Sequence, residues 1–294
     1  MSARVLSGKE LAASIRSEAT ARAAELAAAG TPAKLAVVVA TADESSAWYV
    51  RSIARAAEKS GIMCEIVDLG AEAEPALIRD RLASLSADDT VHGIILQTPL
   101  PQGARLEDLA GAIAFEKDVD GANPLSLGRL AAGLPAFAPA TAEAVVAILD
   151  HHGIDLAGRH VAVVGRSTVV GKPAAHLLLD RNATVTICHS RTRDLAAITS
   201  TADVVVAAVG RAGLITAEHV RPGAVVVDVG TNPTEDGGLV GDVDAVAVAD
   251  SAGALTPVPG GVGPVTTALL LRHTVHALRS SAGGGLGAVR EAES

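Results

Sequence analysis

HVAVVGRSTVVGKPAAHLLLD, residues 160–180, has the pattern of a buried strand, a glycine-rich turn and the start of a helix. Gly165 ends the apolar run, and Gly171 stands where the helical pattern begins. A turn of this kind directs free backbone N–H groups and the positive end of the helix dipole towards an anion. The spacing is G-x-x-x-x-x-G, not the commoner G-x-G-x-x-G, so a purely structural tight turn is the alternative. The stretch predicts a phosphate-binding turn in a dinucleotide-binding α/β fold.

The end of the next predicted strand indicates which dinucleotide would bind. In folds that bind NAD, an Asp or Glu at this place holds the ribose 2′-hydroxyl. Here the strand ATVTIC is followed by His189, Ser190, Arg191 and Thr192, without an acid. Ser and Arg can bind a 2′-phosphate, and Arg166 in the glycine turn adds a second cation. The sequence favours NADP over NAD, with a solvated strand-end charge as the alternative for Arg191.

Strand and helix patterns alternate outward from this stretch in both directions. Short continuous apolar runs are typical of strands buried on both faces, and their alternation with helices predicts parallel sheets covered on both sides. The predicted strands are residues 34–41, 62–68, 91–96, 160–165, 183–188, 203–209 and 224–229, and the main predicted helices are 8–29, 45–60, 73–86, 105–114, 141–152 and 264–280.

A Gly- and Pro-rich irregular passage at residues 121–140 separates the alternating pattern into two parts. We therefore expect two α/β lobes, a first domain at residues 1–138 and a Rossmann-type domain at residues 139–263. The last helix is expected to pack back on the first lobe. The tail, residues 281–294, lacks apolar bulk and is expected to be disordered.

The composition argues against several classes of protein. The 294 residues are 49% hydrophobic and carry a net charge of −9, which gives no electrostatic footprint for nucleic acid. There is no apolar run of about 18 residues and no long apolar segment near the N-terminus, so we expect no membrane span and a cytoplasmic location. Cys64 and Cys188 lie in apolar strand patterns and are expected to be buried free thiols. No metal site is predicted.

Two further segments of the second lobe are candidates for cofactor contact. AAVGRAG (207–213) and VDVGTN (227–232) follow strands, at the edge where a doubly wound sheet binds its ligand. Gly210 would let a cofactor approach the backbone closely, and Thr231 is a further cofactor candidate.

PVPGGVGP, residues 257–264, stands before the last helix. Prolines on both sides of a glycine pair suggest a shaped wall, with Pro259, Gly260 and Gly261 as candidates for substrate contact. The alternative is a connector between the lobes.

Polar residues of the first lobe gather around one predicted strand end. Gln97 follows strand 91–96, and KDVDG places Asp118 and Asp120 in a turn. Two acids in a loop are more often a solvated turn. Beside a strand-end Gln and Tyr49, the single tyrosine of the chain, they suggest the wall of a pocket.

Together these residues resemble the bifunctional methylenetetrahydrofolate dehydrogenase/methenyltetrahydrofolate cyclohydrolase family. The resemblance covers nearly the whole chain in the family's order. It is carried by SGK (7–9), YV (49–50), QTPLP (97–101), KDVDG (117–121), GRL (128–130), GRSTVVGKP (165–173), TVTICHSRT (184–192), ADVVVAAVG (202–210), GAVVVDVGTN (223–232), GLVGDV (238–243) and TPVPGGVGPVT (256–266).

The resemblance implies a folate-binding lobe and an NADP-binding lobe that face each other across a cleft, and a homodimer formed through the cofactor lobe. The implied reactions are hydride transfer from 5,10-methylenetetrahydrofolate to NADP⁺ and hydrolysis of the methenyl product. Tyr49 matches the tyrosine that stacks on folate, Gln97 the glutamine that works with a catalytic lysine, and Asp120 the aspartate that binds the pterin. Arg166, Ser167, Ser190 and Arg191 fall in the segments that hold the cofactor.

One of the departures from the family pattern concerns the catalytic lysine. The family has a lysine four residues after the tyrosine, and this chain has Ile53. Residues four apart share a helix face, so we expect Ile53 to stand in the cleft beside Tyr49. Isoleucine cannot move the proton that hydrolysis requires. Arg51 and Arg55 fall on the opposite side of the helix, and Lys9 is a candidate replacement from elsewhere in the chain.

Four functions follow from this pattern. The first is an NADP-dependent dehydrogenase with weak or absent cyclohydrolase activity, in which Tyr49, Gln97 and Asp120 form the catalytic site. The second is the full bifunctional enzyme, with a water or a displaced lysine in place of the missing group. A non-catalytic folate- or NADP-binding paralogue and an NADP oxidoreductase with another substrate are the remaining alternatives.

Overall fold

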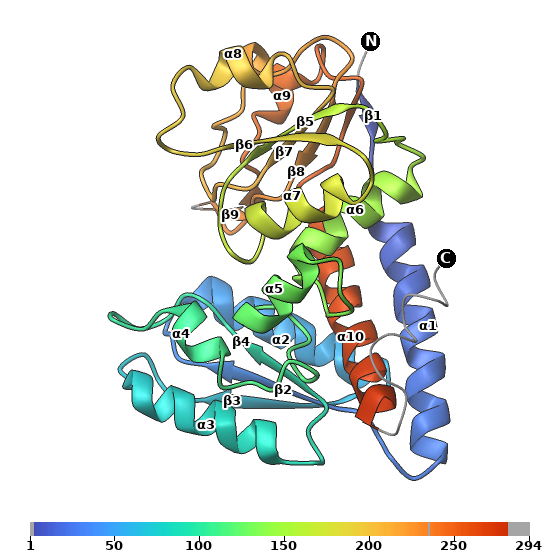
Figure 1. The fold of residues 1–294 in the computed structure, drawn as a ribbon, viewed down its shortest axis with the longest axis vertical. Helices are drawn as coiled ribbons and strands as arrows, with labels where there is room; N and C mark the ends of the chain where they lie inside the picture. The colour runs from blue at the N-terminus through green and yellow to red at the C-terminus, as the bar shows by residue number, and fades with distance from the viewer. Residues whose placement is uncertain (1–2, 235, 282–294) are drawn as a thin grey trace. The chain divides into compact units, whose positions relative to one another are not determined.

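The computed structural model describes residues 3–234 and 236–281 (Figure 1). Its internal contacts divide the chain into two compact units. Of the described residues, unit 1 contains 3–12, 141–234 and 236–266, and unit 2 contains 13–140 and 267–281. The main sheet of each unit is parallel and carries helices, so the predicted fold class of two α/β parts is confirmed.

Unit 1 is built on a parallel sheet of six strands. These are β1 (Arg4–Val5), β5 (His160–Val164), β6 (Thr184–Cys188), β7 (Val204–Ala207), β8 (Val225–Asp228) and β11 (Ala254–Leu255), in the order β1-β11-β8-β7-β5-β6. The helices are α6 (Ala140–His151), α7 (Gly171–Leu179), α8 (Leu195–Thr199) and α9 (Ala245–Val248), with a 3-10 turn at Ala217–His219 and a small antiparallel pair, β9 (Asn232–Pro233) and β10 (Leu239–Val240). In Figure 1, α6 and α7 lie on one side of the main sheet and α8 and α9 on the other. The Val- and Ala-rich central strands are therefore buried on both faces, as continuous apolar runs predict.

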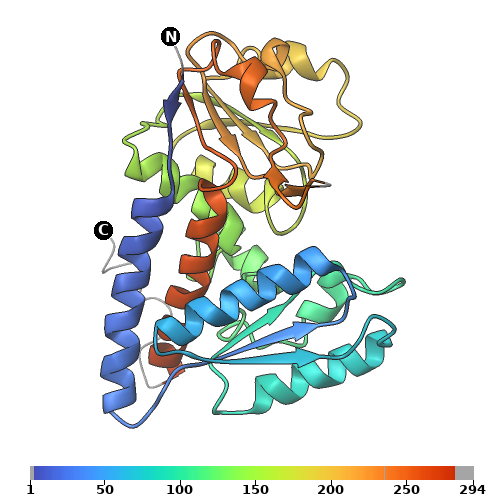
Figure 2. The ribbon, with the colours of Figure 1, turned by 180° about the vertical axis from the view of Figure 1, so that it is seen from behind.

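Unit 2 has a smaller parallel sheet of three strands. These are β2 (Lys34–Val39), β3 (Met63–Asp68) and β4 (Gly93–Leu96), in the order β3-β2-β4. Its helices are α2 (Glu44–Lys59), α3 (Pro75–Ala87), α4 (Leu106–Ala110) and α5 (Pro124–Ala131), together with most of α1 (Lys9–Ala28) and of α10 (Val262–Ser281), whose first residues belong to unit 1. Helix α2 crosses one face of this sheet, and α1 runs beside α10 (Figure 2). Ile78 and Leu82 of α3 form a core with strand residues that include Val38 of β2 and Ile94 of β4.

The first residues of the chain differ from the sequence prediction. The predicted first domain began at residue 1, but β1 pairs with β11 in the sheet of unit 1, with Arg4 opposite Ala254. A strand of two residues is too short to give an apolar pattern, which is why the sequence indicates only the helix that follows. The tail predicted to be disordered falls outside the described residues from residue 282 onward.

The passage at residues 121–140, expected to be irregular, contains helix α5. Asn123 caps this helix, because its side chain accepts a hydrogen bond of 2.7 Å from the N–H of Leu125. Pro124 occupies the first helical position, where its missing N–H costs nothing. Asn followed by Pro is a helix-start signal that the sequence contained.

Among the described residues, no helix is long and apolar enough to cross a membrane. Within the same part of the chain, no three His, Cys, Asp or Glu side chains are grouped so that they could hold a metal ion. Cys64 and Cys188 are free, as expected, but only Cys188 is fully buried.

Candidate cofactor and substrate sites

The turn between β5 and α7 has no room for side chains at its two glycines. A Cβ on Gly165, whose φ is +135°, would stand 2.1 Å from the carbonyl oxygen of Ala208. A Cβ on Gly171 would stand 2.2 Å from the carbonyl oxygen of Gly165. The turn therefore forms a bare backbone cradle, which fits the phosphates of a dinucleotide.

Ser167 closes this turn from inside. Its hydroxyl accepts hydrogen bonds from the N–H groups of Val170, at 3.1 Å, and Gly171, at 3.3 Å. The sequence predicted free N–H groups here, but the Ser167 side chain already satisfies two of them, because a short hydroxyl residue competes for nearby backbone donors. Arg166 and Ser167 are both exposed, so they remain accessible to a ligand.

The ends of β5 and β6 lie side by side. Val164 and Cys188 are partners in the register of the two strands, so Arg166 and Ser190 each follow two residues after a paired position. Beyond β6, the N–H of His189 donates to the Thr192 hydroxyl at 2.8 Å, which folds a tight turn. This turn leaves Ser190 and Arg191 exposed at the same sheet edge as the glycine turn. The structure therefore brings the predicted cofactor residues of the two strands together.

Two buried acids, which the sequence analysis did not assign, shape the remaining cofactor loops. Asp242 is fully buried and accepts hydrogen bonds from the N–H groups of Val209, at 2.6 Å, Gly210, at 3.0 Å, and Arg211, at 2.8 Å. The Asn232 side chain donates a fourth, at 3.0 Å. The loop that contains the candidate Gly210 is thus held by one carboxylate.

Asp228, at the end of β8, is the second buried acid, and it holds the backbone of Asp242 in place. It accepts from the N–H groups of Gly230, at 3.0 Å, Asp242, at 2.9 Å, and Val243, at 3.1 Å. Burial raises the pKa of Asp228 to about 6; Asp242 raises it further, and the backbone donors oppose the rise. An acid directly after a buried Val-rich strand is the signal that could have identified it. The candidate Thr231 follows this anchored segment and is exposed.

Residues 257–264, which the sequence predicted to form a wall of the substrate site, pack against residues near the start of the chain. The N–H of Gly8 donates to the carbonyl oxygen of Gly260 at 2.9 Å. Gly260 has a φ of +107°, and a Cβ there would lie 3.2 Å from Cε of Lys9. Gly261 is buried, whereas Pro259 is exposed. Lys9 thus lies along this glycine loop of unit 1.

In unit 2, Tyr49 and Asp120 lie within electrostatic range of each other, although they are far apart in the sequence. Tyr49 is half-buried on α2, and its hydroxyl makes a hydrogen bond with Thr267 of α10. Burial raises the pKa of Tyr49 far above its usual value, and the negative charge of Asp120 adds to the rise. Burial and the neighbouring Asp118 raise the pKa of Asp120 to about 7, while His273 and the N–H of Ala140 oppose the rise. Two of the predicted substrate residues therefore share one environment.

Asp118 has a structural task in the same turn. It is 1% exposed and accepts hydrogen bonds from the N–H groups of Ala122, at 3.0 Å, and Asn123, at 2.8 Å, and from the Ser126 hydroxyl, at 2.7 Å. Gly121 has a φ of +64°, and a Cβ there would stand 2.5 Å from the N of Pro139. The turn is buried and tightly closed, so a solvated loop is ruled out.

Gln97 is half-buried at the end of β4, and its side chain donates to the carbonyl oxygen of Thr98 at 2.6 Å. The Ser46 hydroxyl on the first turn of α2 donates to the same oxygen at 3.1 Å. The Thr98 carbonyl therefore links Gln97 to the helix that carries Tyr49. None of the hydrogen bonds described for Gln97 joins it to Tyr49 or Asp120.

Ile53 is fully buried inside unit 2, together with Val50 and Ala57 of the same helix. The sequence predicted that Ile53 stands in the cleft beside Tyr49. That expectation is wrong, because α2 turns this apolar stripe towards the core of unit 2. A helix with one apolar stripe gains most from burying the whole stripe.

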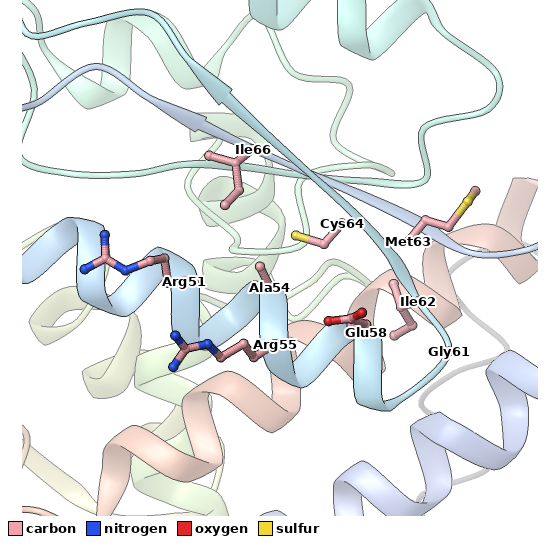
Figure 3. A pocket seen from close by; sticks show the side chains of 9 residues that line it. All are labelled: Arg51, Ala54, Arg55, Glu58, Gly61, Ile62, Met63, Cys64 and Ile66. Atoms are coloured by element: carbon pink, nitrogen blue, oxygen red, sulfur yellow. The ribbon is translucent and has the colours of Figure 1, made fainter.

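The opposite face of α2 borders an open pocket (Figure 3). Arg51 and Arg55 line it from the helix, and Cys64 and Ile66 line it from β3. Neither Tyr49 nor Ile53 is among its lining residues. This pocket is therefore distinct from the surroundings of Tyr49 and Asp120, and the two arginines lie away from them, as the helical spacing predicted.

Comparison with known proteins assigns both parts of the chain. Residues 6–120 match the model of the tetrahydrofolate dehydrogenase/cyclohydrolase catalytic domain, and residues 139–282 match the model of the NAD(P)-binding domain of the same family. Bifunctional protein FolD 1 of Saccharopolyspora erythraea is 68% identical over 278 residues, which cover 95% of each chain. Bifunctional protein FolD of Nocardia farcinica is 65% identical, and the match covers 92% of this chain and 96% of that protein.

Solved structures of similar proteins support the same family assignment. The bifunctional enzyme FolD of Campylobacter jejuni superimposes with a TM-score of 0.90 at 38% identity, covering 94% of this chain and 99% of that one. FolD of Trypanosoma brucei, solved with NADP cofactor and an inhibitor, gives a TM-score of 0.91 at 34% identity, covering 97% and 100%. The predicted family is confirmed: the chain belongs to the tetrahydrofolate dehydrogenase/cyclohydrolase family of enzymes.

Proposed function

We propose that this protein is an NADP-dependent 5,10-methylenetetrahydrofolate dehydrogenase whose methenyltetrahydrofolate cyclohydrolase activity is weak or absent. The observation that carries the proposal is the contrast between the two units. In unit 1 the cofactor turn is complete. In unit 2, Ile53, at the position where the resemblance implies a catalytic lysine, is apolar and fully buried.

The dehydrogenase step depends mainly on positioning. A hydride leaves the one-carbon bridge with its electron pair, the bridge becomes the cationic methenyl group, and bound NADP⁺ would accept the hydride. The protein need not move a proton in this step, so a lysine is dispensable for the chemistry. Tyr49 would stack on the folate, Asp120 would accept the N–H donors of its pterin, and residues 165–171 with Ser190 and Arg191 would hold the cofactor.

Hydrolysis of the methenyl group has a different requirement. Water must attack the cationic carbon and lose a proton, and the opening of the ring requires a proton on nitrogen. A titratable group near the carbon usually accelerates such a step by about 10²–10⁴-fold. Ile53 provides none, which favours accumulation of the methenyl compound.

The full bifunctional enzyme is a second candidate, and one observation favours it. The pKa of Asp120, raised to about 7 by burial and by Asp118, would allow this carboxylate to accept a proton at neutral pH. In that case Asp120 would replace the missing lysine.

A spectrophotometric time course with 5,10-methylenetetrahydrofolate and NADP⁺ decides between these functions. We expect NADPH to form while methenyltetrahydrofolate accumulates and is lost only at its spontaneous rate. Rapid loss of the methenyl compound would favour the bifunctional enzyme. Absence of NADPH would favour a binding-only protein or another substrate.

Replacing Arg191 by serine is expected to raise the KM for NADP⁺ about tenfold and to leave the KM for NAD⁺ unchanged. The reason is that a guanidinium–phosphate hydrogen bond contributes about 1.5–3 kcal/mol, and only NADP⁺ carries the 2′-phosphate. Initial rates at varied cofactor concentration measure the effect. The nearby exposed Arg193 provides the matched control, as Arg193→Ser. An equal rise for NAD⁺ would contradict the assignment of Arg191 to the 2′-phosphate.

We further propose a homodimer formed through the edge of the unit 1 sheet. Strand β6 stands at one end of the strand order, and Ile187 on it is 42% exposed. An exposed apolar edge strand favours pairing with a second copy. Ile187→Lys should yield monomers in light scattering after gel filtration, whereas Leu77→Lys, at a leucine of α3 that is 50% exposed, should not. A wild-type monomer would contradict the proposal. The cytoplasmic location stays a prediction.

A further inference from the structure

His273 of α10 is buried beside the turn that carries Asp118 and Asp120. It is 4% exposed, and its Nδ1 lies 2.8 Å from the carbonyl oxygen of Val119. Because a carbonyl oxygen only accepts hydrogen bonds, Nδ1 must carry the hydrogen. The ring also lies against Phe137, with centroids 4.9 Å apart and planes at 30°. The imidazole is therefore held on two sides.

Val119 lies between Asp118 and Asp120 in the sequence, so the hydrogen bond from His273 holds the middle residue of the turn. Val119 is fully buried, and the structure leaves no spare room around it. A Cβ added to Gly93 of β4 would lie 3.0 Å from Cγ1 of Val119 and 2.9 Å from the hydroxyl oxygen of Thr274 on α10. Strand β4, the turn and α10 thus pack directly together. The hydrogen bond from His273 thus ends at the peptide unit that joins Val119 to Asp120.

The groups that act on Asp120 come from four segments. Asp118 of the same turn repels its charge, and the hydroxyl of Tyr49 on α2 lies within its electrostatic reach. The N–H of Ala140 at the start of α6 donates to Asp120, and His273 of α10 stabilises its charge. Among these described groups, His273 is the one that can carry a positive charge. It acts in the same direction on Asp118.

We propose that His273 is a positioning residue of the folate pocket: it fixes the turn through Val119 and favours the ionised form of Asp120, which a pterin requires. This rests on the proposed function, because Asp120 is taken there to bind the pterin. A pterin presents an amino group and a neighbouring ring N–H. An ionised carboxylate can accept both in parallel, whereas the protonated acid loses one acceptor.

The proposal has a pH-dependent consequence with a definite sign. Folate binding weakens as the pH falls and Asp120 takes up a proton. His273 holds that transition at lower pH, because it favours the charged form of the Asp120 carboxylate. Without the imidazole, the transition moves to higher pH. At pH 8 Asp120 is mostly ionised in the wild-type protein, so the difference that charge contributes is small there.

Two substitutions separate the positional part from the charge. His273→Asn keeps an N–H donor for the Val119 carbonyl and removes the titratable ring. His273→Leu removes both. His276→Asn, one turn further along α10, is the matched control. Folic acid serves as a ligand that undergoes no turnover, and isothermal titration between pH 5.5 and 8.0 measures its Kd; the ligand titrates identically with every variant, so differences report on the protein.

We expect the midpoint of the pH dependence of Kd to rise by about 1 pH unit in His273→Asn, with a Kd at pH 8 that changes by no more than about twofold. We expect His273→Leu to bind about tenfold more weakly at every pH, because the Val119 carbonyl loses its donor. Profiles of His273→Asn that coincide with those of wild type and His276→Asn would overturn the inference and leave the proposed function intact. Absence of folic acid binding by wild type would instead contradict the proposed function.

Discussion

Replacing Ile53 by lysine is expected to raise the rate of methenyltetrahydrofolate hydrolysis by tenfold or more. A general acid–base group typically contributes about 10²–10⁴-fold, and only part of that gain is expected from one substitution in an adapted pocket. Position 53 shares a face of α2 with Tyr49, so the long side chain of a lysine can extend from this buried position towards the tyrosine. Burial lowers the pKa of a lysine, which favours a neutral amine near pH 7. The loss of methenyl absorbance in single-step assays measures the gain.

The same substitution has a cost that a control can isolate. A lysine in the place of a fully buried isoleucine is expected to lower the free energy of unfolding by several kcal/mol. Ile53→Met, which is similar in volume and has no titratable group, should stay folded and gain no hydrolysis. If wild type already hydrolyses the methenyl compound as fast as Ile53→Lys, the proposed loss of the cyclohydrolase is wrong.

Replacing Asp120 by asparagine is expected to lower kcat/KM of the dehydrogenase about 100-fold and, at pH 8, to stabilise the protein. An amide has one acceptor oxygen, and its NH₂ group faces a pterin N–H, so a buried polar contact is lost. The stability effect follows from the native pKa of about 7, which burial and Asp118 raise above the unfolded value of about 3.9.

The sign of the stability effect depends on pH. Between about pH 4 and 7 the folded state binds the proton more tightly than the unfolded chain, so ionisation of Asp120 opposes folding at higher pH. At pH 8 the asparagine variant should therefore be more stable, by about 2 kcal/mol or more, and the advantage should vanish near pH 4. Urea unfolding at the two pH values measures this difference. Glu116→Gln, at an exposed acid of the same segment, should show no such change; a destabilised Asp120→Asn at pH 8 would contradict the raised pKa.

The strands and the glycine turn were predictable because their causes are local. A continuous apolar run such as VVVA at 204–207 indicates a strand that is buried on both faces. At Gly165 the backbone lies so close to the Ala208 carbonyl that only glycine fits. The family was predictable because its motifs recur in order along the chain. These features depend on residue type and spacing, which the sequence contains.

The remaining features depend on contacts between distant residues. The loop at 209–211 is held by Asp242, more than thirty positions away, and no local pattern indicates that pairing. The exposure of Ile53 was mispredicted because spacing along a helix shows which residues share a face, but not what covers that face. His273 was missed for the same reason: its partner, Val119, is 154 positions away in the sequence.

Asp242 also determines what the cofactor loop does before a ligand arrives. Ordering the backbone of one residue costs about 1–2 kcal/mol, and for residues 209–211 that cost is met when the core folds around a buried acid. A dinucleotide that docks there meets a preorganised surface, so little of its binding energy is offset by loop ordering. The three loop amides are tied to a side chain in the interior, and they should exchange their hydrogens with solvent only when the sheet itself opens. We therefore expect the ligand edge of unit 1 to open together with its sheet rather than as a separate loop.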